Sequence, residues 1–354
     1  MGLINKLKNL FSSENIIGID IGDSLIKLVE AETKQNKIIL NNLAVGDTPK
    51  EAVVKGQIED VEALTAKIKS LLDNNNFAST KVTTAISGEQ VIIRNVEIPN
   101  MPEEEIGEAV RWEAKEQIPM PIDEAVLDYE ISKHKADGGY EVMLVAVNRD
   151  TINRYLELFK KLDLEPIAIE IEPTAIIRGI RKLYPEQTIA LLDMGAQTTT
   201  ISVFSNGQLL FTRTIGIAGQ DITQEIVENY ELNLEEAEEY KRDNNLFVDA
   251  NLNLIIRNLT TAIYRSLDYF QVKYKNYDIE KMVLAGGGSK LIGFDTHLSN
   301  EFGIEVIPLN PLSNIESEVE RLNSKELAEV IQLLGVSIGL ALREEDEDDK
   351  SIAS

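Results

Sequence analysis

The stretch IGIDIGDSLIKLVEAE, near the start of the chain, places acids, a hydroxyl and a lysine in the bend between two apolar strand patterns. A hairpin requires only a turn, so Asp20, Asp23, Ser24 and Lys27 need another explanation. At Gly22 no Cβ is present, and backbone N–H groups can therefore approach an anion closely. Hydroxyl and ammonium groups donate to phosphate oxygens, while a carboxylate can hold hydrated Mg²⁺. This combination predicts a site for a metal–nucleotide complex.

A second stretch, TIALLDMGAQTTTISVFSNG, repeats the arrangement of apolar strand, Asp-x-Gly bend and alternating strand. A separation this long indicates two homologous lobes rather than a solenoid of short repeats. We expect Asp20 and Asp193, the equivalent acids, to hold Mg²⁺ through water, with the two bends facing each other across a cleft. The residues of this second bend predicted to contact the nucleotide are Asp193, Gly195, Gln197, Thr198 and Thr199.

A third, glycine-rich bend follows the apolar strand pattern KMVLA. Three consecutive glycines leave no side chain between backbone and ligand, which suits the flat face of a nucleoside. Taken alone, this stretch could equally be a flexible turn. The residues predicted to contact the ligand here are Gly286, Gly287, Gly288 and Ser289.

The composition excludes several other functions. The 354 residues include 35 basic and 60 acidic side chains, a formal charge of −25, so the surface repels nucleic acid and does not attract anionic lipid. The absence of cysteine excludes disulfides and thiolate metal sites, and two histidines, His134 and His297, do not suggest a histidine-rich one. No apolar run reaches the ~20 residues of a membrane span, and no secretory signal pattern is present. We therefore expect a cytoplasmic protein.

Hydrophobic periodicity predicts the α/β elements that position the three bends. The predicted strands before the second bend are 16–22, 25–32, 37–45, 81–86, 90–98, 126–134, 140–147 and 165–171. The predicted helices are 60–73, one within PNMPEEEIGEAVRWEAKEQIPM, 150–162, one from about 173 to 182, several within 219–276, and 325–342. The opening MGLINKLKNLF forms one apolar helical stripe, which either anchors the chain to a membrane or partner or packs on its own domain.

In their order and separation, the three bends resemble the signature of the actin-like ATPase superfamily. The resemblance implies two ribonuclease-H-like lobes flanking a nucleotide cleft. EPTAIIRG is similar to a connecting segment whose acid, here Glu172, positions the attacking water. EEAEEYK resembles the adenosine-contacting helix, with Glu238 and Lys241 as candidates, although a solvated helix face is an equal interpretation. GVSIGLAL resembles the second connecting helix, where Gly335 and Gly339 permit close packing.

One position departs from the superfamily pattern. The residue after the first glycine is usually Ser or Thr, whereas here it is Asp23, with Ser24 next. An additional negative charge beside a triphosphate weakens the site. We therefore expect ATP to bind with slow or no hydrolysis.

Between the lobe elements, RWEAKEQIPMPIDEAVLDY and VNRDTINRYLELFKKLDLEP resemble the PilM family of type IV pilus assembly proteins, relatives of FtsA. The resemblance implies ATP and Mg²⁺ as cofactors and a peripheral location at the inner face of the cell membrane, reached through a partner. The short N-terminal segment of a PilN-like single-span membrane protein would dock between the first lobe and an inserted small α/β subdomain. Assembly motor ATPases and a homo-oligomer or ring are further implied partners.

Apolar residues around the first helix of the insertion provide a composition suited to peptide recognition. Trp112, the single tryptophan, could alternatively belong to a core. The residues predicted to line the partner groove are Met101, Ile106, Val110, Trp112, Ile118 and Met120.

The resemblance also gives domain boundaries. They are an amphipathic segment 1–15, a first lobe (subdomain 1A) of 16–88 plus 165–185, an insertion (1C) of 89–164, a second lobe (2A) of 186–218 plus 279–342, a helical subdomain (2B) of 219–278 and a disordered acidic tail of 343–354. Two alternative functions remain: a membrane-associated, polymerising FtsA-like protein and, with less support, a small-molecule kinase.

Overall fold

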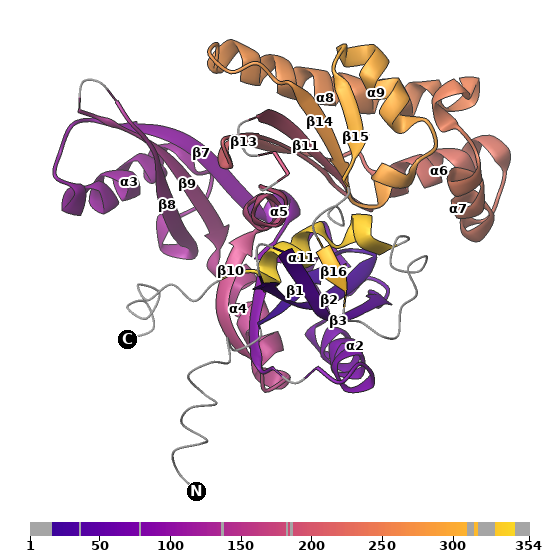
Figure 1. Ribbon diagram of the computed structural model, residues 1–354, viewed down its shortest axis with the longest axis horizontal. Coiled ribbons are helices and arrows are strands. Elements are labelled where there is room, and N and C mark those ends of the chain that lie inside the picture. The colour runs from indigo at the N-terminus through magenta and orange to yellow at the C-terminus, as the bar shows by residue number, and fades with distance from the viewer. Residues whose placement is uncertain are drawn as a thin grey trace, which may run out of the picture.

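The computed structural model describes residues 16–343 apart from 35–36, 78, 136–137, 182, 185–186, 310–314 and 318–329. The predicted amphipathic segment 1–15 and the acidic tail beyond Arg343 lie outside these residues. Figure 1 shows two α/β lobes and a smaller sheet that projects from the junction between them.

The sheet of the first lobe has the order β10-β6-β1-β2-β3-β16. Strands β1, β2 and β3 form an antiparallel meander. The other three are parallel to their neighbours: β6 pairs with β1, β10 with β6 and β16 with β3. The strands are β1 (Ile17–Ile21), β2 (Leu25–Lys34), β3 (Lys37–Asp47), β6 (Lys81–Ile86), β10 (Glu165–Ile171) and β16 (Ile315–Ser317).

The sheet of the second lobe has the order β13-β12-β11-β14-β15, again an antiparallel meander extended by two parallel strands. Asp20 pairs with Lys27 in the first sheet, and Asp193 pairs with Thr200 at the same point of the second. The predicted internal repeat is therefore confirmed. The strands are β11 (Thr188–Met194), β12 (Thr199–Ser205), β13 (Gln208–Ile215), β14 (Lys281–Ala285) and β15 (Glu305–Pro308).

Helices cover the outer faces of both sheets. In the first lobe, α2 (Val61–Asn74) begins where Asp60 accepts a hydrogen bond from the Ala63 N–H, the predicted N-cap. It buries Leu64 and Ile68 against the sheet. The second lobe is covered by α6 (Gly219–Tyr230), α7 (Leu234–Asp243), α8 (Asn253–Lys273) and α9 (Phe294–Phe302), whose apolar faces form its core.

The inserted subdomain is a three-stranded antiparallel sheet packed against one helix. The strand order is β7-β9-β8, with β7 at Val91–Ile98, β8 at Ala125–His134, β9 at Tyr140–Asn148 and α3 at Glu103–Gln117. Ile106, Val110 and Ala114 recur every four residues on α3, which gives the helix one apolar face, and that face is buried on the sheet.

Two helices lie outside their predicted subdomains. Helix α4 (Arg149–Lys161), expected in the insertion, packs on α2 and β10 of the first lobe, and its Tyr155 and Phe159 are fully buried there. Helix α11 (Gly335–Ala341), expected in the second lobe, lies on β1 and β2 of the first. The reason is that every residue of α11 is buried, so the helix needs a surface on several sides. The predicted continuous helix 325–342 is interrupted: a 3₁₀ turn at Ile331–Leu333 precedes α11, and 325–329 lie outside the described residues.

Helix α11 crosses α5 (Glu172–Ile180) at van der Waals distance between backbones. A Cβ added at Gly339 would lie 1.7 Å from the Ala175 carbonyl oxygen, and one at Gly18 of β1 would lie 2.1 Å from that of Ser337. The Arg178 guanidinium also donates to the Gly339 carbonyl at 2.8 Å. The close packing predicted for this helix is thus confirmed at Gly339.

Candidate functional site

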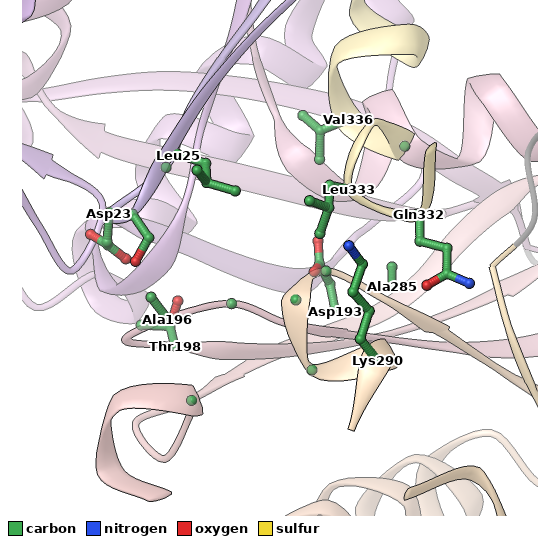
Figure 2. A pocket seen from close by; sticks show the side chains of 18 of the residues that line it. Asp23, Leu25, Asp193, Ala196, Thr198, Ala285, Lys290, Gln332, Leu333 and Val336 are labelled. Atoms are coloured by element: carbon green, nitrogen blue, oxygen red, sulfur yellow. The ribbon is translucent and has the colours of Figure 1, made fainter. Parts of the chain in front are cut away.

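A cavity of about 440 Å³ lies between the two lobes and contains most of the predicted site residues. Figure 2 shows Asp23 and Leu25 of the first bend, Ala196 and Thr198 of the second, and Lys290 and Gln332 towards another part of the cavity. The predicted residues that line it are Asp20, Gly22, Asp23, Ser24, Lys27, Glu172, Asp193, Gly195, Thr198, Glu238, Lys241, Gly286, Gly287 and Gly288. The volume falls within the range of small-molecule sites.

The first two bends have the same backbone closure. The Gly22 N–H donates to the Leu25 carbonyl at 3.0 Å, and the Gly195 N–H donates to the Thr198 carbonyl at 3.0 Å. The bends therefore present equivalent atoms from the two lobes towards one cavity.

Lys27 is the cation among the acids at the centre of the cavity. Its ammonium contacts the Asp20 carboxylate at 2.8 Å, and both side chains are largely buried. Burial lowers the pKa of Lys27, but Asp20, followed by Asp193 and Glu172, raises it, and the net direction is upward. Lys27 therefore remains charged and can contact a phosphate.

Two further acids face this ion pair. Burial raises the pKa of Asp193 to about 6; Lys27 lowers it and Asp20 raises it further. Burial, followed by the charges of Asp193 and Asp20, raises the pKa of Glu172 well above its usual value. Three carboxyls around one ammonium leave an excess of negative charge, which a bound cation would relieve.

The donor set constrains how such a cation is held. Over the part of the chain that the structure describes, no group of three or more acidic or histidine side chains is arranged to ligate a metal ion. Hydrated Mg²⁺ usually needs only one or two carboxylates, with phosphate oxygens as additional ligands. Asp20 and Asp193 fit that role together with a nucleotide.

In the metal-free protein, Asp193→Asn should raise the free energy of unfolding at pH 7.5 by about 1–3 kcal/mol. The folded-state pKa of about 6 lies above the usual 3.8, so the native state binds this proton more tightly and wild type gains stability as pH falls from 7 towards 4. Urea denaturation in EDTA at pH 7.5 and 5.0 measures both effects. The exposed change Asp268→Asn is the control, and a variant less stable than wild type at pH 7.5 would contradict the assignment.

The three glycines of the third bend have different roles. Gly286 has a φ of 72°, and an added Cβ would lie 2.3 Å from an Asp193 carboxylate oxygen. A Cβ at Gly288 would lie 2.5 Å from the Met194 side chain. A Cβ at Gly287 would meet no atom within 4 Å. Two glycines thus let the bend pack on β11, and the middle one leaves room in the cavity.

Three predicted ligands are not among the residues that line the cavity. Thr199 is buried and its hydroxyl donates to the Ile217 carbonyl at 2.7 Å, while the Ser289 hydroxyl donates to Gly286 at 2.7 Å. The Gln197 amide oxygen accepts from the Lys55 N–H at 2.7 Å. These side chains hold the bends in shape. Thr200, which was not predicted, lines the cavity instead; alignment of the two repeats would have revealed that it occupies the position equivalent to Lys27.

The departure at Asp23 is accommodated by a backbone contact. Its carboxylate accepts a hydrogen bond from the Gly56 N–H at 3.0 Å. Burial raises the pKa of Asp23, although Gly56 and Lys27 act in the opposite direction. Ser24, beside it, also lines the cavity.

Lys241 and Glu238 of α7 reach the cavity but are already engaged. The Lys241 ammonium donates to Glu238 at 2.7 Å, to the Thr223 hydroxyl at 2.7 Å and to the Gly219 carbonyl at 3.2 Å. Their observed role is to join α7 to the start of α6. The sequence also missed Arg242, Lys290 and Gln332, which line the same cavity without belonging to a recognised motif.

The prediction that six residues line a partner groove is wrong for three of them. Ile106, Val110 and Ile118 are buried in the core of the insertion, because the helical apolar stripe packs on its own sheet. Met101 and Met120 are partly buried against the same core. Trp112 is 66% exposed, so the interpretation as a core residue is wrong, and the Lys115 ammonium lies 5.4 Å from its ring centroid.

A smaller pocket of about 290 Å³ lies where β6 leads into β7, and strands β12 and β13 of the second lobe also line it. It shares Ser87, Glu172 and Thr200 with the larger cavity, and Arg94 and Arg213 also line it. The two hollows therefore meet at Glu172.

Among the described residues, no helix combines the length and apolar character that crossing a bilayer requires.

Comparison with known proteins gives one matching family and several related structures. The family described as "Type IV pilus assembly protein PilM" matches residues 18–345. A solved PilM–PilN type IV pilus biogenesis complex contains a chain that is 31% identical, with a TM-score of 0.85 over 94% of this chain and 99% of that one. MreB5 of Spiroplasma citri bound to AMPPNP, at 13% identity, has a TM-score of 0.54 over 93% of this chain and 95% of that one, and shares the actin-like fold.

FtsA of Bacillus subtilis is 26% identical over 65% of this chain. The match spans 58% of the FtsA chain, so this chain covers less than two thirds of that relative's length.

Proposed function

Because this chain belongs to the PilM family of type IV pilus assembly proteins, we propose that it is the nucleotide-binding scaffold of a pilus assembly platform. Its ligand would be ATP with Mg²⁺, seated between the lobes. Its partner would be the short N-terminal segment of a PilN-like membrane protein, at the inner face of the cell membrane. Type II secretion and competence systems have related platforms that it could equally serve.

The observation that carries the nucleotide proposal is the pair of equivalent bends facing one cavity. Gly22 and Gly195 occupy matching positions of the repeat, and Gly287 lines the same cavity with open space around its Cα. Lys27 supplies positive charge for phosphates, and Asp20 with Asp193 would hold Mg²⁺ through water. The metal, when bound, would neutralise phosphate charge; the protein's own residues bind and orient the nucleotide.

Glu172 is the proposed residue for positioning a water molecule. Burial and the charges of Asp193 and Asp20 raise its pKa, so it holds a proton more readily than an ordinary glutamate. Asp23 adds negative charge beside the first bend. This added charge supports slow or absent hydrolysis, which suits a scaffold that responds to bound nucleotide.

For the partner, we propose that the docking groove between first lobe and insertion includes this pocket, which is lined by Arg94 of β7 and by Arg213 of β13 in the second lobe. The similarity to a chain of the solved PilM–PilN complex supports a PilN-like partner. The shared lining at Glu172 provides a short physical route between nucleotide and partner. Contacts with motor ATPases and a ring of copies are proposed from family membership alone.

The second candidate is an FtsA-like polymerising protein, favoured by the match to FtsA. Sedimentation with Mg-ATP separates the two proposals, since filaments would pellet and a scaffold would not. A small-molecule kinase would additionally need a polar substrate pocket with its own catalytic acid.

A synthetic peptide of the PilN-like segment should bind about fivefold or more differently with and without saturating Mg-ATP, an effect of roughly 1 kcal/mol. Isothermal titration calorimetry of the full chain measures both affinities. Arg94→Ala in the pocket should weaken peptide binding, whereas Arg111→Ala on exposed α3 should not. Equal affinities would remove the coupling, and no peptide binding would remove the docking proposal.

A further inference from the structure

A small hairpin of the first lobe contacts both phosphate-facing bends. Its strands are β4 (Val53–Val54) and β5 (Gln57–Ile58). Lys55 and Gly56 between them have φ values of 50° and 77°, which is the backbone of a type I′ turn. Val53 and Ile58 are buried in the first-lobe core. The burial of these two side chains therefore fixes the turn to the first lobe.

The two N–H groups of this turn bind side chains from different lobes. The Gly56 N–H donates to Asp23 of the first bend at 3.0 Å. The adjacent Lys55 N–H donates to Gln197 of the second bend at 2.7 Å. Because the acceptors come from opposite sides of the cavity, both bonds form together only when the bends are at this separation.

The same turn packs on the root of the inserted subdomain. A Cβ at Gly56 would lie 2.6 Å from the Ser87 carbonyl oxygen, and one at Gly88 would lie 2.7 Å from that of Lys55. The Lys55 ammonium also lies 3.6 Å from Glu89. These residues lead directly into β7 at Val91, so movement of the turn would displace the first strand of the insertion.

We propose that the Lys55–Gly56 turn is an interlobe latch, meaning a contact that couples the distance between the two bends to the position of the inserted subdomain. This inference rests on the proposed function, in that the nucleotide sets the separation. Gln197 acts through the turn as a positioning residue. The exposed hydrogen bond from the Lys55 N–H to Gln197 contributes little to the free energy of unfolding, so it can break and re-form as the lobes move.

The test is amide hydrogen–deuterium exchange of the full chain with and without saturating Mg-AMPPNP. In wild type, the amides of 88–98 should exchange about three- to tenfold more slowly with nucleotide, the range expected for one hydrogen bond. Gln197→Met, of similar size but without the acceptor, should lose this response. Gln197→Glu keeps an acceptor oxygen and should retain it. Gln224→Met on exposed α6 is the control.

The outcomes separate this inference from the proposed function. A wild-type chain that does not bind Mg-AMPPNP would overturn the proposed function. A chain that binds it without any change at 88–98, or a Gln197→Met variant that responds like wild type when saturated, would overturn the latch alone. Occupancy is measured separately for each variant, so that weaker binding is not mistaken for a lost response.

Discussion

Gly287→Val should weaken Mg-ATP binding about 30-fold or more, equivalent to roughly 2 kcal/mol, while the protein remains folded. A Cβ at this position meets no protein atom within 4 Å, and Gly287 lines the cavity. The added side chain would therefore occupy space reserved for ligand without displacing the bend. Calorimetric titration gives the affinity, and thermal unfolding without nucleotide verifies the fold.

Gly216→Val is the matched control for this substitution. Gly216 is exposed, lies outside the set of cavity-lining residues, and its added Cβ would make only an ordinary contact at 3.5 Å from Glu89. It should leave nucleotide affinity within about twofold, since surface changes usually cost within ±0.5 kcal/mol. Unchanged affinity in Gly287→Val would show that nucleotide does not occupy this part of the cavity.

Gly339→Ala should lower the free energy of unfolding by about 3 kcal/mol, the upper end of the usual cost of overpacking. The new methyl would begin 1.7 Å from the Ala175 carbonyl oxygen, which is backbone of α5 and cannot rotate away. Because α11 lies on β1 and β2 and crosses α5, the whole junction would have to shift. Urea denaturation at neutral pH measures the loss.

Gly179→Ala on the opposite helix supplies the comparison. Its Cβ would lie 3.6 Å from the Gly335 carbonyl oxygen, an ordinary contact. Since alanine favours helix over glycine by about 1 kcal/mol, this variant should be as stable as wild type or slightly more stable. Equal stability of the two variants would mean that the crossing is loosely packed.

The sequence was sufficient for the bends and the repeated strands because both depend on local patterns. An apolar run ending in Asp-x-Gly predicts a buried strand and a bend wherever the chain folds, and the repeat then implies that Asp20 and Asp193 face each other. The N-cap at Asp60 and the apolar face of α3 follow from spacing in the same way.

Long-range relations were not accessible in this way. Helix α11 is apolar on all sides, so its sequence does not indicate which lobe it joins, and β16 pairs with a strand from the opposite end of the chain. The apolar stripe of α3 has the same pattern whether it faces a core or a groove, which is why Ile106 and Val110 were misassigned. Hydroxyls beside a bend, such as that of Thr199, can serve either a ligand or the backbone, and only the folded geometry distinguishes these uses.

A structure of the full chain determined with Mg²⁺ and AMPPNP tests the central claim most directly. The account predicts phosphates between Gly22 and Gly195, the metal near Asp20 and Asp193, and the nucleoside against Gly287. A nucleotide bound elsewhere, or a cleft that remains without one at millimolar AMPPNP, would contradict it.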